Sequence, residues 1–135
     1  MGLSDFLKTK QNGNRKYVTE QQLKKNTAMH MQLAPLTMEN LRLIDDTAHE
    51  ELKLEFFFYT NTSEKAEKFA AELVKLNYEV DHGKAGGVKK LFIITGWTTK
   101  MKMEDSVVTN WTKEMCELGH QFECDFDGWG TTPNQ

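Results

Sequence analysis

Three carboxylates stand at alternate positions near the end of the chain, at Glu123, Asp125 and Asp127. Two such groups can act as general acid and base when a desolvated cleft drives their pKa values apart. Alternate positions lie on one face of a strand, so we expect these side chains to point to solvent together and to stay ionised. The cluster therefore does not predict catalysis, and we expect the protein not to be an enzyme.

Cys116, His120 and Cys124 form a second candidate group, because thiolates and imidazoles are ligands that zinc prefers. Their four-residue spacing is unusual for zinc, and a fourth ligand would have to come from elsewhere in the chain. Cys116 falls in an expected helix and Cys124 on the apolar side of an expected strand, which favours buried structural thiols. We expect no metal site. Two cysteines are also too few for the disulfide framework of a small secreted domain.

The glycine pair at 86–87 is a third candidate site, because backbone N–H groups in glycine-rich loops can bind phosphate. A phosphate-binding loop needs further spaced glycines and a Lys-Ser or Lys-Thr pair that opens a helix, and this segment has neither. A hairpin turn explains the pair more simply. We expect no nucleotide and no other cofactor.

The elements that must position these residues begin where the apolar period changes to two, at Glu51. Alternation from Leu52 to Phe58 predicts a strand, and an apolar stripe from Ala66 to Leu76 predicts a helix that is capped by residues 61–63. Asn77 can end this helix in a left-handed turn. The same reasoning predicts strands over 78–84 and 88–96, a helix over 103–118 that ends at Gly119, and a last strand over 122–126. This order predicts an α+β fold, a ferredoxin-like βαββαβ sandwich with a four-stranded antiparallel sheet and both helices on one face.

The residues before this fold divide into two parts. Residues 1–18 have no sustained apolar period and carry more bases than acids, so we expect a flexible basic arm. Thr19 and Gln22 have the spacing of a capping box, which predicts a helix that ends at Pro35, with a second short helix from Thr37. These form an accessory helical segment over 19–50 ahead of the sandwich, and residues 133–135 form a tail.

The polar side of the expected strands is acidic and holds two aromatic residues, Phe57 and Tyr59. Such a surface repels phosphate but attracts an Arg- or Lys-rich peptide, whose guanidinium groups can stack on aromatic rings. The alternative is an ordinary solvated face, partly covered by residues 19–50. The carboxylates expected on this side are Glu55, Glu79, Asp81, Glu123, Asp125 and Asp127.

Direct RNA binding is a further alternative, because aromatic residues on the open face of such a sheet can stack on bases. Residues 87–92 lack the glycine and aromatic pattern of RNA-recognition strands, and the carboxylates oppose phosphate. The net charge of −3 and the pI near 5.8 also argue against a dedicated nucleic-acid binder. Only the basic arm before residue 26 favours contact with nucleic acid.

The most specific motif is Phe126-Asp127-Gly128-Trp129-Gly130. Glycines on both sides of Trp129 permit a chain reversal, so the indole either packs at the sheet edge or anchors a partner. With this motif, and with the step Leu76-Asn77-Tyr78-Glu79-Val80, the chain resembles the RraB family of regulators of ribonuclease E activity. The resemblance covers about residues 41–132.

The resemblance implies an α/β sandwich domain, here 51–132, in a small non-catalytic protein of the bacterial cytoplasm. No run approaches the roughly 18 apolar residues of a membrane span, so we expect no membrane association. It also implies that the protein binds ribonuclease E outside the catalytic domain and inhibits or redirects RNA decay. We hypothesise that a basic segment of a ribonuclease E-type enzyme binds the acidic surface. Two alternatives stay open: an RNA-binding domain that uses the basic arm, and an interaction or immunity module for an unrelated protein. The expected partner-binding residues are Phe57, Tyr59, Glu123, Asp125, Asp127, Gly128, Trp129 and Gly130.

Overall fold

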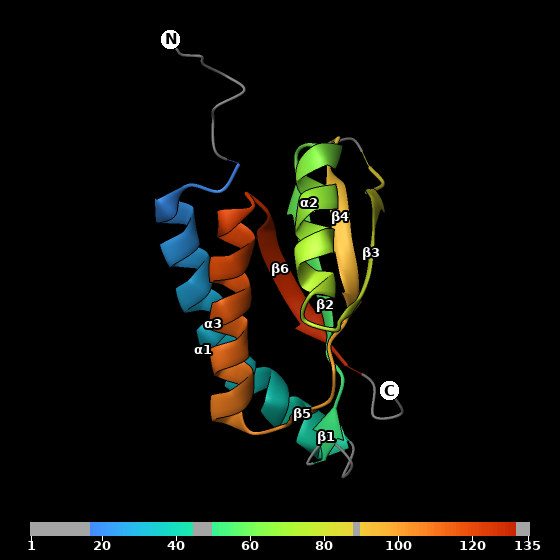
Figure 1. Cartoon of the computed structure of the whole chain (residues 1–135). Coiled ribbons are helices and arrows are strands. Elements are labelled where there is room, and N and C mark those ends of the chain that lie inside the picture. Colours follow the sequence, from blue (N-terminus) through green and yellow to red (C-terminus); the bar gives the residue numbers. More distant parts are fainter. Residues whose placement is uncertain (1–16, 45–49, 88–89, 132–135) are drawn as a thin grey trace.

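The computed structural model describes residues 17–44, 50–87 and 90–131 (Figure 1). The elements along the chain are α1 (Glu20–Ile44), β1 (Glu51–Leu52), β2 (Glu55–Thr60), α2 (Ser63–Val74), β3 (Glu79–Lys84), β4 (Phe92–Trp97), β5 (Met101–Lys102), α3 (Asp105–Gln121) and β6 (Asp125–Gly130). Within the described ranges, no helix is both long and apolar enough to cross a membrane. The predicted basic arm over 1–18 falls mostly outside these ranges, as does the predicted tail.

The strands form two antiparallel sheets. The larger has the order β3-β4-β2-β6, and the smaller is the short pair β1-β5. The predicted hairpin joins β3 to β4, which pair from Glu79 opposite Trp97 to Lys84 opposite Phe92. The predicted α+β class is therefore confirmed.

One face of the large sheet carries the hydrophobic core. In β2 the even-numbered side chains are buried, because successive residues of a strand point to opposite faces. The ring centroid of Phe58 lies 4.6 Å from that of Phe69 on α2 and 5.1 Å from that of Phe126 on β6. Both α2 and α3 therefore pack on this face (Figure 1). The largest fully buried side chains include Phe56, Phe58, Phe69, Met38, Leu54, Leu73, Ile94 and Val108.

The start of α1 confirms the capping box. The Thr19 N–H donates to Gln22 Oε1 at 2.9 Å, and the Gln22 N–H donates to Thr19 Oγ1 at 3.1 Å. Each side chain thus satisfies a backbone donor that the first helical turn leaves without a partner. The cap of α2 is also as predicted, since Thr62 Oγ1 accepts from the Lys65 N–H and Asn77 is left-handed at φ 66°.

The prediction of two helices separated at Pro35 is wrong, because α1 continues through this residue. Proline removes one helical hydrogen bond and costs about 3 kcal/mol in a helix interior. Tertiary contacts on both sides offset that cost: Ala34 and Met38 are each 1% exposed in the core. Beyond them, Arg42 Nη2 donates to the Met103 carbonyl at 3.0 Å. Figure 1 shows α1 changing direction as it passes behind α3.

The predicted last strand over 122–126 is displaced, because α3 runs to Gln121 and β6 begins at Asp125. Gly119 is not the residue that ends the helix. It is a point of close packing, since an added Cβ would lie 2.6 Å from the carbonyl oxygen of Cys124 in the following turn and 2.8 Å from the ring of Phe58 in β2. The left-handed residue of this turn is Glu123, at φ 59°. The glycine therefore serves close packing, and the chain reverses four residues later.

Candidate functional site

The face of the large sheet opposite the core is built from the odd-numbered residues of its three neighbouring strands. We call it the open face, and it is defined by Glu55, Phe57 and Tyr59 of β2, Glu79 and Asp81 of β3, and Ile93, Thr95 and Trp97 of β4. The strand register aligns these residues in rows, such as Glu55–Trp97–Glu79 and Phe57–Thr95–Asp81. The open face therefore combines aromatic rings with carboxylates.

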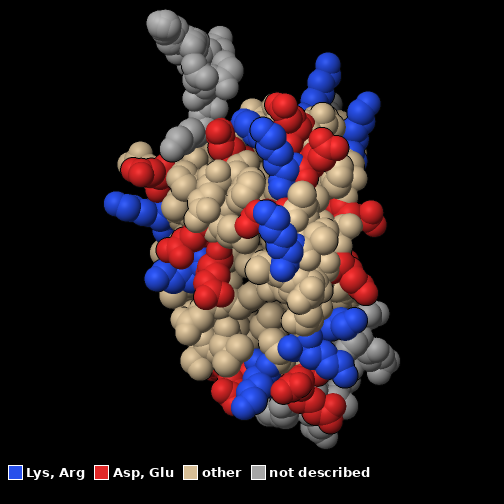
Figure 2. All heavy atoms as spheres, in the orientation of Figure 1, with Lys and Arg blue, Asp and Glu red and all other residues tan. Residues whose placement is uncertain are grey.

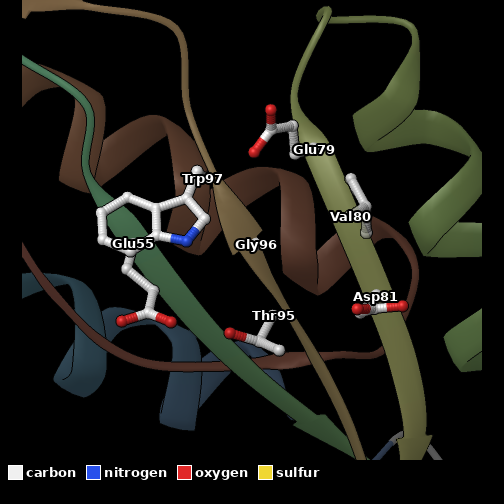
Figure 3. Close-up of a pocket in the computed structure, with 7 residues that line it drawn as sticks. All are labelled: Glu55, Glu79, Val80, Asp81, Thr95, Gly96 and Trp97. Atoms are coloured by element: carbon white, nitrogen blue, oxygen red, sulfur yellow. The ribbon is translucent and has the colours of Figure 1, made fainter. Parts of the chain in front are cut away.

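Trp97 lines a hollow of about 240 Å³ in the open face, together with Glu55, Glu79 and Asp81. Its cross-strand partners on the two sides are Glu55 and Glu79. Figure 3 shows the Glu55 carboxylate beside the indole, with Glu79 and Asp81 extending from the neighbouring strand. A flat ring next to carboxylates suits a guanidinium or ammonium group, which the ring quadrupole and the charges attract together.

The charge of this surface differs from that of the helix side of the molecule. In Figure 2, which shows the helix side, basic and acidic side chains are interspersed. The paired rows of the open face contain Glu55, Glu79 and Asp81 but neither Lys nor Arg. Like charges in neighbouring rows produce a negative potential that favours a cationic partner and opposes phosphate.

The predicted carboxylate cluster is not a single surface. Glu123 lies in the α3–β6 turn, not on a strand, and its carboxylate is already engaged. Its Oε1 is 3.1 Å from Lys65 Nζ and accepts the Tyr17 N–H at 3.1 Å. Glu123 thus connects the segment before α1 to the start of α2. The sequence pattern missed this because both partners lie far from it along the chain.

Asp125 and Asp127 occupy two further environments. Asp125 is half-buried and its Oδ1 accepts a hydrogen bond from Asn26 of α1 at 2.5 Å. Burial raises the pKa of Asp125, and the Asn26 hydrogen bond partly opposes that shift. Asp127 is exposed and is the extra residue of a β-bulge, because the partners of Phe57 and Phe58 are Gly128 and Phe126.

The Asp-Gly-Trp-Gly motif forms most of β6 and does not make the predicted chain reversal. Trp129 pairs with Phe56, is half-buried and packs against the core, as one of the two sequence interpretations proposed. Gly128 and Gly130 pair with Phe57 and Glu55 of the open face. A Cβ added to either glycine would meet open space, so the glycines leave the flanks of Phe57 and Glu55 uncovered.

The structure places Phe57 and Tyr59 half-exposed on the open face, on the side that their alternation in the sequence predicted. Trp97 was missing from the expected binding residues, although Ile93, Thr95 and Trp97 alternate in the same way along β4. The run of four apolar residues over 91–94 hid that alternation. One alternative placed residues 19–50 over part of this face, but the most extensive contact of α1 is with α3.

The second group, Cys116, His120 and Cys124, does not form a ligand set. Both thiols are free and buried, as expected of structural cysteines. Burial raises the pKa of Cys116 to about 11 and that of Cys124 to about 12, so both stay protonated at neutral pH. Across residues 17–44, 50–87 and 90–131, no three His, Cys, Asp or Glu side chains are arranged to hold a metal ion.

A family model described as regulator of ribonuclease activity B, RraB, matches residues 37–131, from the second half of α1 to the end of β6. No curated protein matches the chain. Because the family model covers most of the chain, including every strand of both sheets, the protein belongs to the RraB family.

Proposed function

We propose that this protein is a non-catalytic regulator of RNA decay in the cytoplasm, and that it binds a basic segment of a ribonuclease E-type enzyme through the open face. The family supports a role in the regulation of ribonuclease activity. The observation that carries the binding surface is the position of Trp97, in a hollow between Glu55 and Glu79. We also assign the fold to the ferredoxin-like class, which the strand order β3-β4-β2-β6 supports.

The chemistry of the open face favours a protein segment over RNA. A guanidinium stacked on an indole contributes about 0.5–2 kcal/mol, depending on how well the pair is desolvated. Carboxylates on both sides add charge-assisted hydrogen bonds to such a group. For RNA the same carboxylates would repel the phosphates, whose contacts dominate nucleic-acid affinity.

In this proposal the Asp-Gly-Trp-Gly motif contributes to both faces of the sheet. Trp129 packs on the core side and holds β6 in register with β2. On the opposite side of β6, Gly128 and Gly130 place no side chain beside Phe57 and Glu55, so the flanks of these two residues stay accessible. Asp127, exposed at the bulge, adds a negative charge near those flanks.

The test is the affinity of the purified chain for the ribonuclease E-type enzyme of the same host, measured by calorimetry. The double variant Glu55→Lys/Glu79→Lys should bind at least about tenfold more weakly, because it reverses the charge on both sides of Trp97. Its matched control is Glu64→Lys/Glu67→Lys, which makes the same charge change at exposed positions of α2 on the helix side. Circular dichroism and thermal melting establish that both variants fold.

Three results contradict the proposal. The wild-type chain does not bind the enzyme, or the two double variants bind equally well, or the wild-type chain binds enzyme without changing its rate of RNA cleavage. Substitution of Glu123 or Asp125 is a poor test, because each carboxylate holds an internal contact and its loss would disturb the fold. Titration of RNA into the chain in the calorimeter, without the enzyme, tests the RNA-binding alternative. Tight, salt-sensitive binding would favour a nucleic-acid ligand.

A further inference from the structure

The two edges of the large sheet differ. At the β6 edge, the ring of His30 from α1 lies against Phe126, with ring centroids 4.9 Å apart, and its Nε2 is 3.1 Å from the Phe126 carbonyl oxygen. Along the opposite edge, no strand of the described ranges pairs with the outer side of β3. Glu79, Asp81, His82 and Lys84 of this strand are exposed. One edge is therefore covered by a helix and the other is accessible.

The backbone groups that β3 presents at its free edge follow from the register. The Ala85 N–H donates to the Leu91 carbonyl at 2.9 Å, so residue 85 belongs to a hydrogen-bonded pair with β4. Hydrogen-bonded and non-bonded pairs alternate along antiparallel strands. Residues 83, 81 and 79 therefore bond to β4 as well, whereas Val80, His82 and Lys84 direct their N–H and C=O groups away from it.

The β2–β4 pairing supports this phase independently. The Thr98 N–H donates to the Leu54 carbonyl at 2.9 Å, which places 98, 96, 94 and 92 among the residues of this segment that bond toward β2. The alternate residues of β4, including Trp97 opposite Glu79, then bond toward β3. Both observations leave the same three residues of β3 with outward donors and acceptors.

Charge determines which chain suits this edge. Glu79 and Asp81 project from β3 onto the open face, where Glu79 shares a row with Trp97 and Asp81 lies in the next row. A strand added to β3 would place alternate side chains directly opposite or diagonal to these carboxylates, at about 5–8 Å. Basic residues there would be attracted. A second copy of this chain would instead bring its own Glu79 and Asp81 to the same side of the joint, where like charges repel.

We propose that the free edge of β3 pairs with an extended segment of the protein partner that carries arginine or lysine at alternate positions, so that the sheet gains a fifth strand. This inference rests on the proposed function and specifies how the partner is held. Backbone hydrogen bonds to Val80, His82 and Lys84 supply affinity, and the carboxylates of the open face select basic side chains. Charged side chains along β3 also explain how an accessible edge avoids aggregation.

The first test changes a single backbone donor. His82→Pro removes the central outward N–H without removing a bond to β4, and proline is tolerated at edge positions of this kind. His82→Ala is its matched control, because it removes the same side chain and keeps the N–H. We expect His82→Pro to weaken the complex with the enzyme by about tenfold or more, and His82→Ala to bind as the wild type does.

The second test uses a short synthetic peptide in which arginine alternates with valine. Two derivatives are N-methylated, one at every arginine and the other at every valine, so each loses the N–H groups along one edge only. If the peptide adds to β3 as a strand, one derivative should lose binding to the wild-type chain and the other should keep it. Equal loss or equal retention overturns the proposal.

The outcomes also separate this inference from the function on which it rests. If the enzyme binds the wild-type chain and the His82→Pro variant equally, the edge inference fails and the open-face proposal stands. If the enzyme does not bind the wild-type chain, the proposed function fails. If light scattering shows a wild-type dimer that His82→Pro dissociates, β3 is an interface between copies, which overturns the basic-partner inference.

Discussion

The two faces of the large sheet are made by alternate residues of the same strands, yet they have opposite roles. Phe56 and Phe58 are fully buried on the core face, whereas Phe57 between them is half-exposed on the open face. A displacement of one residue in register would exchange the two sets. The three consecutive phenylalanines are therefore not equivalent. Phe56 and Phe58 stabilise the core, whereas Phe57 is accessible to a partner.

The sharpest test of this comparison is a pair of matched truncations. Phe58→Ala should lower the free energy of unfolding by about 3–5 kcal/mol, because it removes a ring that contacts Phe69 and Phe126 and leaves a cavity. Phe57→Ala should cost less than about 1 kcal/mol and should weaken partner binding instead. Urea denaturation measures both changes, and similar stability losses would mean that the open face is covered.

A second pair compares two glycines of the sheet. At Gly96 a Cβ would overlap the Glu79 carbonyl oxygen and lie 2.9 Å from the ring of Phe56, so Gly96→Ala should cost about 1–3 kcal/mol. At Gly83, on the accessible edge strand, nothing lies within 4 Å of an added Cβ. Gly83→Ala should change stability by less than about 1 kcal/mol. Thermal melting of the two variants tests whether β4 packs tightly against β3 at Gly96, on the core face, and whether the open face has free space at Gly83.

The covered edge should give the fold a modest pH dependence. Burial lowers the pKa of His30 below its ordinary value of 6.5. The unfolded chain then binds a proton more readily than the folded one, so the unfolding free energy should fall as pH drops below about 6.5. The slope attributable to His30 cannot exceed about 1.4 kcal/mol per pH unit.

Melting curves between neutral and mildly acidic pH, compared with those of His30→Gln, measure this contribution. Removal of His30 should flatten the profile in that range. His82→Gln serves as the control, because His82 is exposed on the free edge. An unchanged profile for His30→Gln would show that the contact between α1 and the β6 edge does not depend on the charge of this ring.

The smallest expected effect on stability tests the glycines of β6. Gly130→Val adds a side chain in open space beside Glu55, so the unfolding free energy should change by no more than about 0.5 kcal/mol. Binding of the partner should nevertheless weaken, because the added side chain covers the flank of Glu55. Gly128→Val is not a suitable substitute, since its φ of 137° would strain any other residue. Unaltered affinity for Gly130→Val would confine the binding surface to β2, β4 and β3.

Local features were readable from the sequence wherever the physics itself is local. The capping box at Thr19 and Gln22 joins groups three residues apart, and Asn77 tolerates the left-handed turn that ends α2. The alternation through Phe56 and Phe58 assigned both faces of β2 correctly, because a strand has no other way to present its side chains. The sequence by itself therefore determined most elements, the core face of β2, and the family.

Only the tertiary structure decided the features that depend on distant contacts. α1 continues through Pro35 because Ala34 and Met38 are buried on both sides of it. α3 continues past Gly119, and this glycine packs closely against the Cys124 carbonyl. Glu123 and Asp125 do not belong to the expected acidic surface, because both carboxylates hold internal contacts. Glu123 contacts Lys65 and Tyr17, and Asp125 accepts a hydrogen bond from Asn26. Trp97 lies between Glu55 and Glu79 only because β4 pairs with both β2 and β3. Each outcome depends on residues far apart in the chain, whose proximity no local pattern encodes.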